Sequence, residues 1–131
     1  MEVKVTVEKS SDGTYAAFME DVLPDFGLAG YGQSAKEAID DFFCSVEETK
    51  EFLRNNGKEF PDINFSFYYD LQSFFSYFSY LNISKIGEKS GISPSLMRQY
   101  VAGSAKASQK QYDKIRHTIS EIVNELSVAS I

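Results

Sequence analysis

The stretch from Ile83 to Tyr100 constrains the fold of this chain more than any other part of the sequence. Gly87 is the small residue that two helices need where they cross, and Gly91 can adopt the positive φ that ends a helix. Ser93 is a good helix N-cap, and Pro94 suits the first position of the helix that follows. The apolar side chains available to hold the two helices together are Ile86, Ile92, Met97 and Tyr100. The spacing therefore predicts two short helices that cross steeply, as in a helix-turn-helix.

The polar residues of the second helix are the candidate binding residues. If Met97 and Tyr100 face inward, helical spacing turns Arg98 and Gln99 to the opposite side. Arginine suits O6 and N7 of guanine, glutamine suits N6 and N7 of adenine, and hydroxyls at a helix N-terminus can bind phosphate. The predicted DNA-binding residues are Ser93, Ser95, Arg98 and Gln99 on this helix, and Lys85, Ser104, Lys106, Ser108 and Lys110 as backbone contacts. The alternative is an exposed helix of a small helical domain that binds nothing.

Two further helices are expected around this pair. Asp70 can cap a short helix that carries Leu71, Phe74, Phe75 and Phe78. Ser108 begins a long last helix with an apolar stripe made of Tyr112, Ile115, Ile119, Ile122, Val123 and Leu126. We expect this stripe to cover the helix-turn-helix and its end to pair with a second subunit. Residues 70–131 are thus predicted to form an all-helical, DNA-binding domain.

The first half of the chain predicts a small sheet. Apolar and polar residues alternate over residues 2–8, as in a strand with one buried face. Residues 11–13, Ser-Asp-Gly, suit a hairpin turn before a return strand over residues 15–19. A short third strand is expected over residues 28–32, although glycine-rich strands are weakly determined.

One helix and a fourth strand complete this sheet domain. Ser34 and Glu37 have capping-box spacing, and the helix after them carries Ala35, Ile39, Phe42, Val46 and Leu53 on one face. It is expected to end near residues 55–57. Alternation of Ile63, Phe65 and Phe67 predicts a fourth strand, which a helical crossover places parallel to the first. The predicted fold class is α+β, with a ββ(β)αβ sheet domain over residues 1–69 followed by the helical domain.

Aromatic residues are concentrated where the two halves meet. Ten of the 19 aromatic residues lie between Phe60 and Tyr80. We interpret them as a core shared by the last strand and the next helix, because each buries a large area. The alternative, a base-stacking platform, is disfavoured because too few basic residues are interleaved with them.

Composition excludes several classes of protein. A chain of 131 residues can form one ordinary domain or two small ones, and 43% hydrophobic with 24% charged residues is typical of globular proteins. No run of about 18 apolar residues and no signal-peptide pattern is present, so we expect a cytoplasmic protein without a membrane segment. Cys44 and His117 are the only cysteine and histidine, which predicts no disulfide and no zinc site. No phosphate-binding glycine loop precedes a helix, and we expect no cofactor.

Charge is divided unevenly along the chain. Residues 1–70 carry 6 Lys and Arg against 15 Asp and Glu, whereas residues 71–131 carry 7 against 4. This division favours an acidic surface for a basic partner and a basic surface for nucleic acid. The alternative is two solvated surfaces that happen to differ.

No set of residues typical of an enzyme is recognisable. A ribonuclease H-type site needs several carboxylates that converge on two metal ions, usually from central strands, but the first strand has Lys4 and Thr6 at its middle. The acidic pairs at residues 40–41 and 47–48 fall on the outer helix, where a solvated face is the ordinary explanation. We therefore expect a protein that is not an enzyme.

Two parts of the sequence together resemble the HicB-like antitoxins of bacterial type II toxin–antitoxin systems. The first is the hairpin from Val3 to Phe18 with Leu23-Pro24-Asp25 and Gly30-Tyr-Gly-Gln-Ser-Ala-Lys-Glu-Ala38. The second is the stretch 83–103 with residues 107–111, Ala-Ser-Gln-Lys-Gln, which is similar to the Cro/repressor-like helix-turn-helix of one branch of that family.

This resemblance implies a partial RNase H-like domain that binds and neutralises a small, basic, RNA-cleaving toxin (HicA-like). It also implies repression of the operon that encodes both proteins, through double-stranded operator DNA. The alternative is a stand-alone transcriptional regulator whose N-terminal domain dimerises or senses a ligand. In both cases we expect a homodimer or a higher homo-oligomer, because one recognition helix buries little surface.

Overall fold

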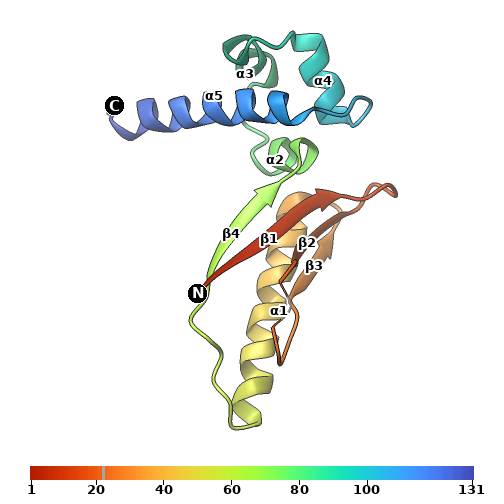
Figure 1. Cartoon of the computed structure of the whole chain (residues 1–131), viewed down its shortest axis with the longest axis vertical. Coiled ribbons are helices and arrows are strands. Elements are labelled where there is room, and N and C mark those ends of the chain that lie inside the picture. Colours follow the sequence, from red (N-terminus) through yellow and green to blue (C-terminus); the bar gives the residue numbers. More distant parts are fainter. Residues whose placement is uncertain (22) are drawn as a thin grey trace. The chain divides into compact units, whose positions relative to one another are not determined.

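The computed structural model describes every residue except Val22, and it is a mixed α+β chain with a four-stranded sheet and five helices (Figure 1). The chain divides into two compact units, Met1–Tyr77 and Phe78–Ile131, which we call unit 1 and unit 2. Unit 1 contains β1 (Glu2–Lys9), β2 (Tyr15–Met19), β3 (Ala29–Gly32), α1 (Ala35–Asn55), β4 (Asn64–Tyr69) and α2 (Leu71–Tyr77). Unit 2 contains α3 (Ile83–Ser90), α4 (Pro94–Ala102) and α5 (Gln109–Ser127).

The sheet has the predicted order of elements and the predicted parallel pair. Its strands are arranged β3-β2-β1-β4, with β1 antiparallel to β2 and parallel to β4. Val5 of β1 lies opposite Met19 on one side and Phe67 on the other. The predicted hairpin turn is confirmed, because Gly13 has φ +89° and its N–H donates to Ser10 O.

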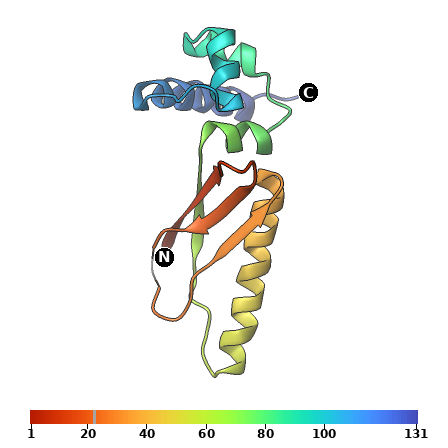
Figure 2. The same cartoon turned by 90° about the vertical axis from the view of Figure 1, so that its right-hand side faces the viewer.

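Helix α1 covers one face of this sheet (Figure 2). Val3, Val5 and Val7 are at most 2% exposed, and Phe42 of α1 is fully buried against them. A side chain at Gly30 would collide with the backbone of α1, so the glycine of β3 allows the helix to lie close to the sheet. The helical residues predicted to face the sheet, Ala35, Ile39, Phe42, Val46 and Leu53, are all buried.

The start of α1 is a cap with one difference from the predicted capping box. Ser34 Oγ accepts from the N–H of Glu37 at 3.1 Å, as expected for an N-cap. The Glu37 carboxylate accepts from the N–H of Gln33 at 2.7 Å, one residue earlier than in the standard box. Both bonds satisfy N–H groups at the junction of β3 and α1.

Helix α2 belongs to unit 1, whereas the second domain was expected to begin at residue 70 and to include this helix. Asp70 caps α2 as predicted, since its Oδ1 accepts from the N–H of Ser73 at 2.7 Å. Its other oxygen accepts from the N–H of Lys9 at 3.0 Å and so ties the cap to β1. Leu71 is 7% exposed, and α2 contacts α1 and β1. The helix ends at Tyr77, so Phe78 lies outside it.

The aromatic residues between Phe60 and Tyr80 are divided between core and surface. Phe65 packs edge-to-face on Phe42, with 5.2 Å between ring centroids, and Phe75 is 5% exposed. Tyr68 and Tyr80 are 56% and 81% exposed. The predicted core role therefore holds for part of this set.

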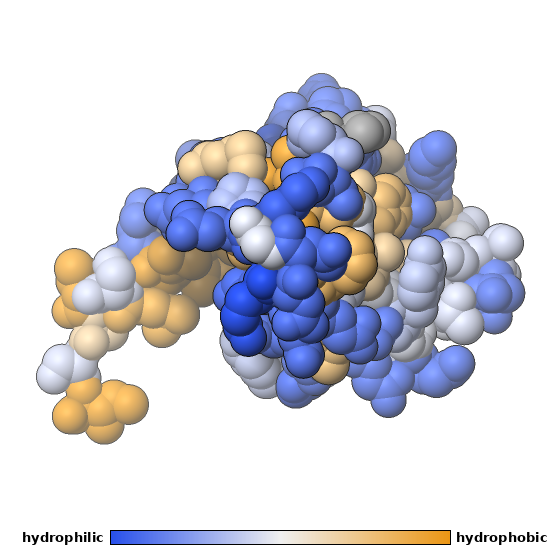
Figure 3. Space-filling view, turned by 90° about the horizontal axis from the view of Figure 1, so that it is seen from below, coloured by the Kyte–Doolittle hydropathy of each residue, from blue (hydrophilic) through white to orange (hydrophobic). Residues whose placement is uncertain are grey.

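Helices α3 and α4 form where two short helices were predicted, and α5 begins directly after its predicted cap, Ser108. In α5 the first part of the predicted stripe is covered, with Ile115 only 4% exposed. The second part is open, since Val123 and Leu126 are 57% and 68% exposed. Apolar side chains at the C-terminal end of the chain stand out in Figure 3. None of the described helices combines the length and hydropathy of a transmembrane segment.

Candidate nucleic-acid interface

Helices α3 and α4 touch at Gly87. A Cβ at this position would lie 2.5 Å from Cγ of Met97, closer than real Cβ contacts, and 3.0 Å from the carbonyl oxygen of Ile92, which is tight. Ile86 and Ile92 are each 4% exposed, and Met97 is fully buried. The absence of a side chain at Gly87 thus sets how closely α4 approaches α3.

The turn between these helices is fixed by backbone and side-chain bonds. Gly91 has φ +75°, and the N–H of Ile92 donates to Gly87 O at 2.8 Å, which ends α3. Ser93 Oγ then accepts from the N–H of Leu96 at 3.2 Å and begins α4, with Pro94 at its first position. The start of α4 is therefore held relative to the end of α3.

Helix α5 supports this pair through contacts that sequence reasoning missed. Ser90 Oγ donates to Ile86 O (2.7 Å) and lies at hydrogen-bond distance, 2.8 Å, from Thr118 Oγ1, and Thr118 is 2% exposed. Gln111 Nε2 donates to the hydroxyl of Tyr100 at 3.2 Å. The burial of Thr118 could have been predicted from its position, because it follows Ile115 by three residues on the buried side of α5.

The face of α4 opposite to Met97 and Tyr100 is exposed. The structure brings together on it the predicted Ser95, Arg98 and Gln99, and Ser93 is exposed at the start of the helix. At about 100° per residue, Ser95 lies between Arg98 and Gln99 around the helix axis. Ala102, an exposed small residue that we did not predict, has nearly the same direction as Ser95.

Arg98 is available for an external ligand. Across the chain apart from Val22, its guanidinium has no hydrogen-bond or ion-pair partner. By contrast, Arg116 of α5 pairs with Asp113 at 2.8 Å. Lys85 pairs with Glu88 at 3.5 Å, but both side chains are more than half exposed, so this pair is weak and the lysine can exchange partners.

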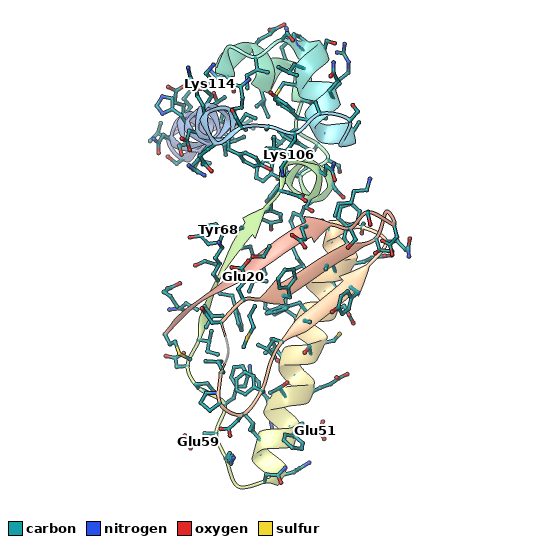
Figure 4. All side chains as sticks on the ribbon, turned by 45° about the vertical axis from the view of Figure 1, so that its right-hand side comes forward. Glu20, Glu51, Glu59, Tyr68, Lys106 and Lys114 are labelled. Carbon is teal, nitrogen blue, oxygen red and sulfur yellow. The ribbon has the colours of Figure 1, made fainter. Side chains whose placement is uncertain are left out.

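The remaining predicted residues lie in or next to the loop between α4 and α5. Ser104, Lys106, Ser108 and Lys110 are all exposed. Figure 4 shows Lys106 on this loop and Lys114 on α5. Ser108 Oγ caps α5 by accepting from the N–H of Gln111 at 3.3 Å, and Ser104 Oγ donates to Gln99 O at 3.4 Å. Both hydroxyl groups therefore form hydrogen bonds with the protein's own backbone in the absence of a ligand.

A second polar surface lies on the face of the sheet away from α1, which we call the open face. Lys4 Nζ lies 4.7 Å from the ring centroid of Tyr68 and 3.9 Å from the Glu20 carboxylate, which also accepts from the hydroxyl of Thr6 at 2.8 Å (Figure 4). Strand alternation places Glu2 and Glu8 on the same face. The open face therefore carries three carboxylates and one lysine.

The carboxylates of the chain are dispersed. In the part of the chain that the structure describes, no three His, Cys, Asp or Glu residues lie close enough together to hold a metal ion. Hydrogen bonds from the Thr14 side chain and backbone lower the pKa of Asp12 in the β1–β2 turn. A hydrogen bond and ion pair with Asp40 raise the pKa of Lys36 on α1. Both groups are exposed, and their partners lie two and four residues away in the chain.

Comparison with protein-family models, with curated proteins and with solved structures finds no match to this chain.

Proposed function

We propose that unit 2 binds double-stranded DNA sequence-specifically, with α3 and α4 as a helix-turn-helix and α4 in the major groove. The observation that carries this proposal is the exposed face of α4, where Arg98 and Gln99 project from a helix whose position is fixed by Gly87 and Ser93. A rigidly held helix can place such side chains within reach of base edges. The excess of Lys and Arg over Asp and Glu in unit 2 supports binding to a polyanion.

Each residue of this interface has a role that follows from its chemistry. Arg98 reads guanine through O6 and N7, Gln99 reads adenine through N6 and N7, and the methyl group of Ala102 can contact the thymine methyl. Phosphate groups are bound by the exposed hydroxyls and ammonium groups around this face, which are Ser93, Ser95, Ser104, Ser108, Lys85, Lys106 and Lys110. The amides at the start of α5 add further donors for phosphate.

The DNA-binding form is proposed to contain two or more copies of the chain. One recognition helix buries less surface than specific binding at nanomolar concentration requires. Two copies related by a two-fold axis would read half-sites about 34 Å apart. Light scattering of the full chain at micromolar concentration measures the mass, and a monomer that protects a single half-site in footprinting contradicts this part of the proposal.

Selection from a randomised duplex library tests the DNA-binding proposal. We expect the full chain to enrich one sequence motif, and the double variant Arg98→Ala, Gln99→Ala to enrich none. The matched control is Lys114→Ala with Arg116→Ala, which removes charge from α5 and leaves α4 intact. If the wild-type chain enriches no motif, or if the control loses the motif as the α4 variant does, the proposal is wrong.

A second role is favoured by the charge of unit 1, which carries 6 Lys and Arg against 15 Asp and Glu. We propose that its open face binds a small basic protein, as the resemblance to HicB-like antitoxins implies, and that unit 1 performs no chemistry. Complementary charge steers such a partner onto the three carboxylates of this face. Under the alternative, a stand-alone regulator, unit 1 has no such partner.

A neighbouring gene for a basic protein of roughly the size of one small domain, about 60–90 residues, provides the test. We expect its product to co-purify with the chain. The open-face variant Glu2→Gln, Glu8→Gln, Glu20→Gln should lose this partner. The control Glu47→Gln, Glu48→Gln, Glu51→Gln changes the charge of α1 equally and should retain it. Absence of such a neighbour, or equal loss in both variants, favours the stand-alone regulator.

A further inference from the structure

We propose that strand β4 is a self-association edge, which pairs antiparallel with β4 of a second copy to join two sheets. This inference stands on the sheet alone and does not depend on DNA binding. It also supplies the two copies that the proposed function needs. The sheet order β3-β2-β1-β4 makes β3 and β4 the two edge strands. The two edges differ in whether side chains bond to their outward backbone N–H groups.

The β3 edge is closed by carboxylates from α1. The N–H of Tyr31 in β3 donates to Asp41 Oδ2 at 2.9 Å, and the N–H of Gln33 just after it donates to Glu37 Oε2 at 2.7 Å. These two backbone N–H groups could otherwise pair with another strand, but their hydrogen bonds are made within the chain. A negative charge at each position also opposes the approach of a foreign carbonyl oxygen.

In the part of the chain that the structure describes, no carboxylate accepts from the backbone N–H of Phe65 or Phe67 in β4. The N–H of Asn64 donates to Met1 O and the N–H of Asp70 donates to Val7 O, both in β1 or next to it. Because every second residue of a parallel strand bonds to the same neighbour, the N–H groups of Phe65 and Phe67 point away from β1. The strand reads Asn-Phe-Ser-Phe-Tyr-Tyr, without a charged residue, proline or glycine. Such an edge is a template for pairing.

Side chains along this edge are incompletely covered. Phe65 and Phe67 are half-buried and contact Phe43, which is itself 42% exposed, with ring centroids 6.1 and 5.8 Å apart. On the open face Tyr68 is 56% exposed. A partner strand would bury aromatic surface on both faces of the sheet, where cross-strand aromatic pairs stabilise pairing.

Antiparallel pairing of β4 with β4 of a second copy keeps the acidic residues that flank the strand apart. Antiparallel pairing about Phe67 sets Phe65 opposite Tyr69 of the partner subunit and Ser66 opposite Tyr68 of the partner subunit. The same register sets Asp70 opposite Asn64 of the partner subunit. No two carboxylates face each other in this register, although unit 1 is strongly acidic. Parallel pairing in register would oppose Asp62 to Asp62 of the partner subunit and Asp70 to Asp70 of the partner subunit.

Disulfide cross-linking of the full chain tests this register. Ser66 and its partner Tyr68 would form a non-hydrogen-bonded pair, whose Cα atoms lie about 4.5 Å apart, within the range a disulfide spans. The variant Ser66→Cys with Tyr68→Cys is made with Cys44→Ser, because Cys44 is exposed. We expect mild oxidation to convert it to covalent dimer. The matched control, Ala29→Cys with Tyr31→Cys on the β3 edge in the same background, should stay uncross-linked.

Amide exchange gives an independent readout on the wild-type chain. The amides of Ser66 and Tyr68 bond to β1 and should be protected at every concentration. Those of Phe65 and Phe67 should become protected only as the chain associates. If they exchange freely in the associated chain, or if cross-linking is equal on both edges, β4 is not the interface. If the chain still associates in that case and Leu126→Lys dissociates it, the interface lies instead at the exposed end of α5.

Discussion

Tyr69, the last residue of β4, provides a test of packing at the scale of one side chain. Burial raises the pKa of Tyr69 to about 12, above its ordinary value of 10.0, and the neighbouring Tyr77 contributes to the shift. A group whose pKa is raised by folding stabilises the fold below its unfolded pKa and loses that contribution as pH rises towards the folded value. The stability of unit 1 should therefore fall between pH 10 and pH 12.

The measurement is the thermal unfolding midpoint against pH for the wild type and for Tyr69→Phe. We expect the variant to lose less stability across this interval, because phenylalanine does not ionise. Tyr68→Phe is the control, since Tyr68 lies on the open face and is mostly exposed. Identical pH profiles for the wild type and Tyr69→Phe would show that ionisation at this position does not limit stability.

Single residues differ in how well the sequence predicted their roles. Gly87, Gly91 and Ser93 were predictable because a helix crossing and a cap require particular residue types at fixed spacing. Thr118 was missed because a threonine on a helix carries no apolar signal, and its burial depends on Ser90 lying opposite it. Ala102 was not among the predicted interface residues, because the sequence does not show that a small apolar residue lies on the exposed face of α4.

At the scale of elements, Gly87 tests the crossing of α3 and α4. Gly87→Ala places a Cβ against Met97, and overpacking of this kind costs about 1–3 kcal/mol. We expect a lower unfolding midpoint of unit 2 and weaker DNA binding, because α4 must move to accommodate the methyl group. Gly27→Ala is the control, since Gly27 has open space around the added Cβ. A Gly87→Ala chain as stable as the control would mean that close approach is not required there.

The elements themselves followed from sequence patterns, whereas their grouping did not. Alternation in β1 and the apolar face of α1 are local signals, so their ranges and the parallel pairing of β4 with β1 could be predicted. Helix α2 was expected in the second domain but groups with unit 1, because tertiary packing and the bond from Lys9 to Asp70 attach it there. Sequence also could not distinguish the closed β3 edge from the open β4 edge, which depends on Asp41 reaching across from α1.

At the scale of the whole molecule, the proposed binding of unit 2 to DNA should weaken as the salt concentration rises. Neutralised phosphates release counterions, so the logarithm of the binding constant should fall linearly with the logarithm of salt concentration. If Lys106 contacts a phosphate as proposed, Lys106→Ala should lower this slope by about 0.9 and weaken binding to all sequences equally. Lys36→Ala, on α1 in unit 1, is the control and should leave the slope unchanged. An unchanged slope for Lys106→Ala would remove it from the interface.

Whether α4 reads bases is tested by combining one protein substitution with substitutions of each base pair in the selected motif. Binding of the wild type and Arg98→Ala is measured on the same set of duplexes. We expect Arg98→Ala to lose about 1–3 kcal/mol of discrimination at one guanine position and to leave the preferences at the other positions intact. Equal loss of affinity on the preferred motif and on every altered duplex would contradict this expectation, because Arg98 would then contact only the phosphate backbone.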